Sequence, residues 1–165
     1  MAASEVIKHL YDGELYLVDG TAVTPIELIV PFSIGDFSLS GLVADQRDIK
    51  IYKVRGIKQS IRLGEETEPT GSFSCDVADY SDAADKTVAD FVLQQASYSA
   101  NITTLQNCNE VYTLNLVWNV EGTDCGDAAD HVITCTNCRV TMDMSEGEPN
   151  TLSFSFVVLG TVTMT

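Results

Sequence analysis

The chain has 165 residues, of which 45% are hydrophobic and 20% charged, and 24 Asp and Glu against 9 Lys and Arg give it a net charge of −15. This composition is too apolar for a disordered chain and the length suits one core, so we expect a single domain over residues 1–165. The acidic excess disfavours a protein that binds nucleic acid or an anionic membrane, because such binding depends on Lys and Arg that neutralise phosphates.

Alternation of apolar and polar residues with a period of two dominates the chain and predicts half-buried antiparallel strands. The first candidates are weakly patterned and lie at residues 14–18, 26–32, 36–43 and 48–54. The next segment, IKQSIRL (57–63), alternates more cleanly. In this segment we expect the side facing the core to carry Ile57, Ile61 and Leu63.

Four later segments alternate in the same way, at residues 72–78, 111–120, 132–142 and 151–159. Turns rich in Gly, Pro, Asp and Asn separate them. One helix is predicted at residues 86–96, KTVADFVLQQA, where Thr87 is placed to cap the first turn and apolar residues recur at helical spacing. The predicted fold class is therefore mainly β, with two packed antiparallel β-sheets, sandwich- or barrel-like, and one flanking helix near residues 86–96.

The segment VITCTNCRVTM contains a Cys-x-x-Cys pair, Cys135 and Cys138. A zinc knuckle needs a tight turn between its thiolates, and a thioredoxin-type pair needs a helix after it, but the segment has no Gly or Pro and no helical period. Residues three apart in a regular strand point to opposite sides. We therefore expect Cys138 on the buried side with Val140, Met142 and Met144, Cys135 on the opposite side, and no metal site.

No catalytic constellation is visible in the sequence. Neither His9 nor His131 lies in a nucleophile motif, although a cysteine–histidine dyad with His131 stays open as an alternative. Asp124, Asp127 and Asp130 lack the spacing of a calcium loop, so a solvated turn is favoured. Glycine spacing matches no nucleotide-binding loop. We predict a non-enzymatic protein without a cofactor.

The first residues, MAASEVIKHLYDGE, contain no apolar segment typical of a secretory signal. Five cysteines in a chain without such a signal favour reduced thiols. No apolar run approaches the roughly 18 residues that a membrane helix needs, so no membrane partner is expected.

Segment order and spacing carry a resemblance that spans about residues 11–160. The first half contains YDGELYLVDGTAVTPIELIVPFSIGDFSLS, IYKVRGIKQSIRLGEETEPTGSFSCDV and the helix KTVADFVLQ. The second half continues with NCNEVYTLNLVW and EGEPNTLSFSFVVLG. In this order the segments resemble those of the tail tube proteins, or major tail proteins, of tailed bacteriophages.

The resemblance implies a structural virion protein whose rings, typically hexameric, stack into a tail tube around a channel for the viral genome. An acidic lining would suit such a conduit, because carboxylates repel phosphates, so phage DNA would pass without specific binding. The implied partners are copies of the chain itself, a tape-measure protein, and tail initiator and tail terminator proteins. The implied location is the virion tail, after assembly in the host cell cytoplasm.

We expect two long loops, 42–57 and 64–71, to order on assembly and bridge successive rings. The charged candidates for the subunit interface are Arg47, Arg55, Glu65, Glu66 and Glu68. The alternatives are a head-to-tail joining protein, a capsid decoration protein and a small-ligand-binding β-barrel. The four classes differ in what the protein forms. A tube protein would form long open tubes, a joining protein single rings, and a decoration protein would bind capsids. A ligand-binding barrel would be a monomer with an internal cavity.

Overall fold

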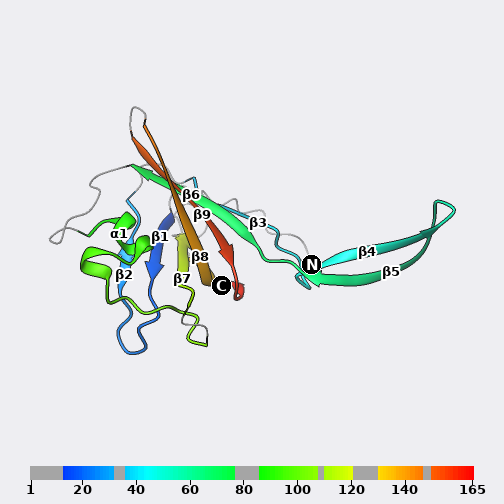
Figure 1. The fold of residues 1–165 in the computed structure, drawn as a ribbon, viewed down its shortest axis with the longest axis horizontal. Coiled ribbons are helices and arrows are strands. Elements are labelled where there is room, and N and C mark those ends of the chain that lie inside the picture. Colours follow the sequence, from blue (N-terminus) through cyan, green and yellow to red (C-terminus); the bar gives the residue numbers. More distant parts are fainter. Residues whose placement is uncertain (1–12, 32–35, 77–85, 108–109, 121–129, 147–149) are drawn as a thin grey trace.

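A computed structural model describes residues 13–31, 36–76, 86–107, 110–120, 130–146 and 150–165. The described strands are β1 (Gly13–Val18), β2 (Glu27–Ile29), β3 (Ser38–Ser40), β4 (Arg47–Val54), β5 (Ile57–Glu66), β6 (Thr70–Asp76), β7 (Leu114–Val120), β8 (His131–Ser145), β9 (Thr151–Val158) and β10 (Val162–Met164). The helix α1 spans Val88–Leu93, and a 3-10 turn follows at Ala96–Tyr98. The fold class is confirmed as mainly β, with a large antiparallel sheet, a second small sheet and one short helix (Figure 1).

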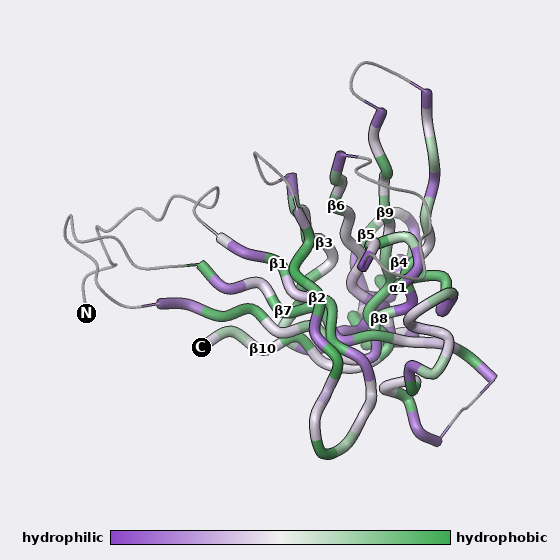
Figure 2. The backbone as a smooth tube through the Cα atoms, turned by 90° about the vertical axis from the view of Figure 1, so that its left-hand side faces the viewer, coloured by the Kyte–Doolittle hydropathy of each residue, from purple (hydrophilic) through white to green (hydrophobic). Residues whose placement is uncertain are grey.

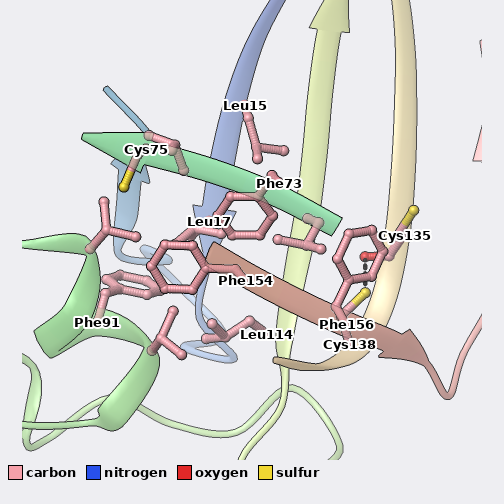
Figure 3. Close-up of a cluster of buried hydrophobic side chains, with 14 of the residues drawn as sticks. Leu15, Leu17, Phe73, Cys75, Phe91, Leu114, Cys135, Cys138, Phe154 and Phe156 are labelled. Atoms are coloured by element: carbon pink, nitrogen blue, oxygen red, sulfur yellow. Dashed lines mark hydrogen bonds between the residues drawn. The ribbon is translucent and has the colours of Figure 1, made fainter. Parts of the chain in front are cut away.

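One large sheet has the strand order β2-β1-β7-β8-β9-β6-β3, and β10 joins it along β8. The long strand β8 belongs to both halves, because it pairs with β7 along residues 131–138 and with β9 along residues 138–145. Strands β6 and β9 cross over β1 and β7, with apolar side chains between them (Figure 3). A single sheet that folds back on itself thus supplies the two packed layers.

A β-bulge in β8 corrects the prediction for the Cys-x-x-Cys pair. Cys138 lies opposite Leu114 and Cys135 opposite Leu116, so β8 has one residue more than β7 in this interval. Asn137 takes up that residue in the left-handed region, with φ 54. The extra residue reverses the alternation, and both thiols point inward, with exposed fractions of 1% for Cys135 and 0% for Cys138. The expectation of opposite sides was wrong.

The core is aromatic at its centre. Phe73 of β6 and Phe154 of β9 lie opposite each other in register and stack with ring centroids 4.7 Å apart. Phe91 from α1 lies beside Phe154 in Figure 3 and is fully buried. The predicted core side of residues 111–120 is confirmed, because Leu114, Leu116, Trp118 and Val120 are all buried. Along β8, Val140 and Met142 pack partly against the core, whereas Met144 is 55% exposed, contrary to expectation.

The predicted helix exists but is shorter than expected. Thr87 caps it as predicted, with its hydroxyl accepting a hydrogen bond from the Asp90 amide at 3.1 Å. Gln94 then adopts a left-handed conformation with φ 54 and donates its amide to the Asp90 carbonyl, which ends the helix. Val88, Phe91 and Val92 form its buried side.

The small sheet is a hairpin of β4 and β5 that projects away from the large sheet (Figure 1). Two expectations are corrected here. Residues 42–57 and 64–71 are mostly strand, with only residues 67–69 between β5 and β6. The supposed core side of IKQSIRL is exposed, with fractions of 68%, 52% and 52% for Ile57, Ile61 and Leu63. These three residues also do not share a side, because a register shift between Tyr52 and Lys53 turns Ile57 to the side opposite Ile61 and Leu63. None of the described segments packs over this hairpin.

Figure 2 shows green hydrophobic and purple hydrophilic stretches alternating along the described strands. Among the described residues, no helix combines the length and apolar character needed to cross a membrane.

Candidate assembly surface

The hairpin is closed by a tight turn at Arg55 and Gly56. Both residues have positive φ, 52 and 80, which is the pattern of a type I′ turn and matches the twist of the strands that it joins. Ile51 lies opposite Ile61 and Val54 opposite Ile57, and the register shifts by one residue between Tyr52 and Lys53. At the base, the Thr67 amide donates to the Gln46 carbonyl at 2.8 Å and holds the two strands together.

Both sides of the hairpin carry exposed apolar groups. One side bears Ile49, Ile51, Ile61 and Leu63, each between 50% and 63% exposed. The other side bears Tyr52 and, at the turn, Val54 and Ile57, between 52% and 68% exposed. Soluble monomers rarely expose contiguous apolar surface of this kind, and where they do it marks an interaction site.

The charges on the hairpin are segregated along its length. Residues 49–64 hold five cations and no acid: Lys50, Lys53, Arg55, Lys58 and Arg62. The flanking residues 45–48 and 65–68 hold five acids and one cation: Asp45, Asp48, Glu65, Glu66 and Glu68, with Arg47. In a chain with a net charge of −15, the outer part of the hairpin is therefore a basic arm on an acidic base.

The structure places all five predicted interface residues on this hairpin or directly beside it. Arg47 lies opposite Glu66 at the base, and Arg55 occupies the turn. The Glu65 carboxylate lies 3.5 Å from the Lys50 ammonium, with both side chains exposed, a geometry that contributes little to stability. Glu68 is exposed between β5 and β6.

A groove of about 520 Å³ opens at the base of the hairpin. One wall is formed by Leu42, Val43, Ala44, Gln46, Glu66 and Pro69, and the other by Gly160, Thr161, Val162 and Met164. Leu42, Val43 and Met164 are 42%, 54% and 61% exposed, so apolar surface continues from the hairpin into the groove. Strand β10 could not be predicted from the sequence, because three strand residues between polar threonines are too few to show an alternating pattern.

Among the described residues β10 pairs with β8 alone, so its outer edge is free within that part of the chain. The residues that flank β10 also bond to β8: the Thr136 amide donates to Thr161 O at 3.0 Å, and Thr165 and Val132 exchange bonds of 3.0 and 2.9 Å. Thr163 lies between them, opposite Thr134. In an antiparallel pair, alternate residues point their amides and carbonyls to opposite edges. The backbone groups of Val162 and Met164 therefore face away from β8.

A second surface, unnoticed in the sequence, covers the outer side of β8, β9, β6 and β3. Register aligns hydroxyls into rows across these strands: Thr141, Ser155, Ser72 and Ser38 form one row. Cross-strand hydroxyl pairs lie 2.7 Å apart for Thr141 with Ser155 and 2.8 Å for Ser38 with Ser72. Each residue alternates with a core residue, so the signal was present in the strand pattern and was overlooked.

The cysteine pair is a part of the core. The Cys138 thiol donates to the Cys135 carbonyl at 3.5 Å, and its hydrogen bond with the Cys135 thiol, together with burial, raises the pKa of Cys138 above its ordinary value. In the described part of the chain, no three His, Cys, Asp or Glu side chains gather closely enough to hold a metal ion. His131 is exposed at the start of β8. His9, Asp124 and Asp127 lie outside the described residues.

No protein-family model and no curated protein sequence matches the chain. Three solved structures share its fold over nearly their whole length. A chain of the extracellular contractile injection system PVC, in its sheath/tube terminator in the extended state, has a TM-score of 0.58 at 14% identity and covers 99% of both chains. A chain of the PVC sheath–tube complex has a TM-score of 0.54 at 12% identity, covering 98% of this chain and 93% of its own. A chain of the anti-feeding prophage tube-terminating cap has a TM-score of 0.53 at 15% identity, covering 100% and 95%.

Proposed function

We propose that this chain is a structural subunit of a phage-type tail that joins copies of itself into stacked rings, forming a tail tube. The observation that carries this proposal is the β4–β5 hairpin, which holds a concentration of exposed apolar groups away from the core. The fold shared with tube, terminator and cap structures of contractile injection systems supports the same class. The role is mechanical and needs no catalytic residue or cofactor.

The shape of the subunit favours contacts between unlike surfaces. A hairpin that inserts into a different part of the next copy makes a heterologous contact, which closes a ring in one direction or repeats as a tube in another. Arg47, Arg55, Glu65, Glu66 and Glu68 all lie on or beside this hairpin, so we keep them as the charged residues of the interface. A two-stranded hairpin is only marginally stable alone in water, and burial between subunits would stabilise it.

The assembled tube would be a conduit for the phage genome. The acidic balance of the chain would keep phosphates from binding its wall, so DNA would pass without specific contacts. We propose that subunits assemble in the host cell cytoplasm with a tape-measure protein, a tail initiator and a tail terminator, and that the product belongs to the virion tail.

A second candidate is a protein that ends the tube instead of building its length. The PVC sheath/tube terminator and the anti-feeding prophage cap are among the structures with this fold, and the terminator has the higher TM-score of the three described. Such a protein would form one ring and stop, as would a head-to-tail joining protein.

Electron microscopy of the purified protein, together with sedimentation velocity over a concentration series, tests both candidates. Hollow tubes of indefinite length support the tube subunit. Single rings of fixed mass support the terminator. A protein that stays monomeric at all concentrations, alone and with the tail proteins encoded beside it, contradicts both.

A further inference from the structure

We propose that the groove between residues 42–46 and β10 is the docking site for the outer end of the β4–β5 hairpin of a second copy of this chain. This inference rests on the proposed function and names the surface that the hairpin contacts. The turn of the hairpin cannot reach the groove of its own copy, because the groove lies at the base of the hairpin and the 8 residues of β4 separate that base from the turn. At about 3.4 Å per residue, the turn lies roughly 27 Å from the base.

Charge complementarity identifies the occupant. The outer part of the hairpin, residues 49–64, contains five cations and no acid. Glu66 lines the groove at the hairpin base, and Asp45 and Glu68 are the sequence neighbours of its lining residues Ala44, Gln46 and Pro69. A basic arm that approaches this base finds opposite charges, whereas two arms or two bases would repel each other. The pairing of arm with base between copies is therefore favoured.

Apolar surface matches at the same place. Val54 and Ile57, opposite each other at the end of the hairpin, are 57% and 68% exposed. Leu42, Val43 and Met164 offer exposed apolar side chains around the groove. Burial of one set against the other removes apolar area from water on both copies, which is a main source of favourable free energy in association.

The free edge of β10 adds a directional contact. The amides and carbonyls of Val162 and Met164 face away from β8, and both residues line the groove. A two-stranded hairpin also has an unpaired outer edge on each strand. An extended segment that pairs with an exposed edge extends the sheet across the interface and satisfies both edges. The hairpin has the length and the extended form that this pairing requires.

The proposed contact is heterologous, because it joins the hairpin arm of one copy to the groove of another. Each copy would offer its arm to one neighbour and its groove to another, so the association repeats in one direction. This arrangement places Arg55 of one copy near Glu66 of the next. Reversal of either charge alone should therefore weaken association between copies, and reversal of both charges in the same chain should restore it.

Photo-crosslinking locates the contact directly. Full-length chains carry p-benzoylphenylalanine in place of Ile57, are mixed with ¹⁵N-labelled chains, irradiated under assembly conditions, and mapped by mass spectrometry. We expect crosslinks between labelled and unlabelled copies at residues 42–46 or 160–164. The same group in place of Leu93, which is 47% exposed at the end of α1, is the matched control and should give no adduct in the groove.

A charge swap tests the pairing in solution. Arg55→Glu and Glu66→Lys should each weaken association by at least about tenfold, and the combined variant should return to within about threefold of the native chain. Arg139→Glu and Asp143→Lys change the same charges at exposed positions on β8 and serve as controls. Their effect should stay below about threefold.

Crosslinks at the groove, with rescue by the combined variant, support the proposal. Crosslinks from Ile57 to another part of the second copy, or a combined variant no better than the single ones, overturn the docking site and leave the proposed function standing. A native chain that shows neither association nor crosslinks between copies, alone and with the tail proteins encoded beside it, overturns both.

Discussion

Replacement of the central isoleucine pair of the hairpin, Ile51→Thr with Ile61→Thr, separates association from folding. Threonine keeps the branched side chain that strands favour, so the change removes apolar surface at nearly constant strand propensity. Ile51 and Ile61 lie opposite each other and are 50% and 52% exposed, so the monomer has gained only half of the burial energy available from each.

The magnitude follows from those exposed fractions. Full burial of an isoleucine stabilises by about 1.5–3 kcal/mol, so the half that remains contributes about 0.75–1.5 kcal/mol per side chain when a neighbour covers it. The pair therefore contributes about 1.5–3 kcal/mol to each contact, and its loss weakens association roughly 10- to 150-fold. The melting temperature of the monomer should fall by less than about 3 °C, because the hairpin lies outside the core.

Sedimentation velocity over a concentration series measures the association, and differential scanning calorimetry measures the melting temperature. Val157→Thr is the matched control, since Val157 is a 36% exposed branched residue on the outer side of β9, and it should leave association unchanged. A large fall in melting temperature with unaltered association would refute the reasoning, because it would mean that the hairpin packs onto its own body.

Three further predictions concern the core: substitutions at Asn137 and at Phe154, and the pH dependence of the Cys75 thiol. Asn137→Val should destabilise by about 1–2 kcal/mol in urea denaturation, because a branched residue is strained at φ 54, whereas Asn137→Gly should be nearly neutral; equal midpoints would contradict the bulge. Phe154→Ala should lower the free energy of unfolding by about 3–5 kcal/mol, and a loss below about 1 kcal/mol would contradict the stacked pair with Phe73. Burial, with Asp76 and Asp36 nearby, raises the pKa of the Cys75 thiol from 9.0 to about 11. The stability that this thiol contributes is thus present below pH 9.0 and lost as the pH rises towards 11, and peptide mapping should show slow alkylation at pH 8 in the folded chain but fast alkylation in urea.

The strands could be predicted from the sequence because an alternation of apolar and polar residues directly reflects a strand with one buried and one exposed side. The segments that became β1, β7, β8 and β9 were recognised within a few residues, and Thr87 was recognised as the helix cap. Alternation does not report what covers the apolar side. Ile61 and Leu63 alternate with polar residues as cleanly as the apolar residues of β9 do. Yet Ile61 and Leu63 are exposed on the hairpin, whereas the inward-facing apolar residues of β9 are buried. A side reserved for a neighbouring copy and a side reserved for the core have the same pattern.

The bulge in β8 could not be predicted for a different reason. A single inserted residue changes the direction of every side chain beyond it, and Asn137 is the only local signal, because Asn tolerates the left-handed region better than most residues. The partner spacing that reveals the insertion, two residues on β7 against three on β8, is a property of the pair of strands. The two cysteines therefore occupy one side of the strand, and the pair that looked like a metal or redox motif in the sequence fills the core.

The distribution of charge along the chain agrees with the proposed role of the hairpin as the contact between copies. Residues 47–66 hold six of the nine Lys and Arg but three of the 24 Asp and Glu, so this segment has a net charge of +3 and the rest of the chain −18. In the proposed assembly, direct contact between two acidic bodies would be opposed by charge repulsion. A basic arm that extends beyond the body can reach the neighbour's acids while it keeps its own like charges at a distance. Salt screens such an attraction least within about 8 Å at physiological ionic strength, so close contact through the arm would supply the electrostatic gain that direct contact between bodies lacks.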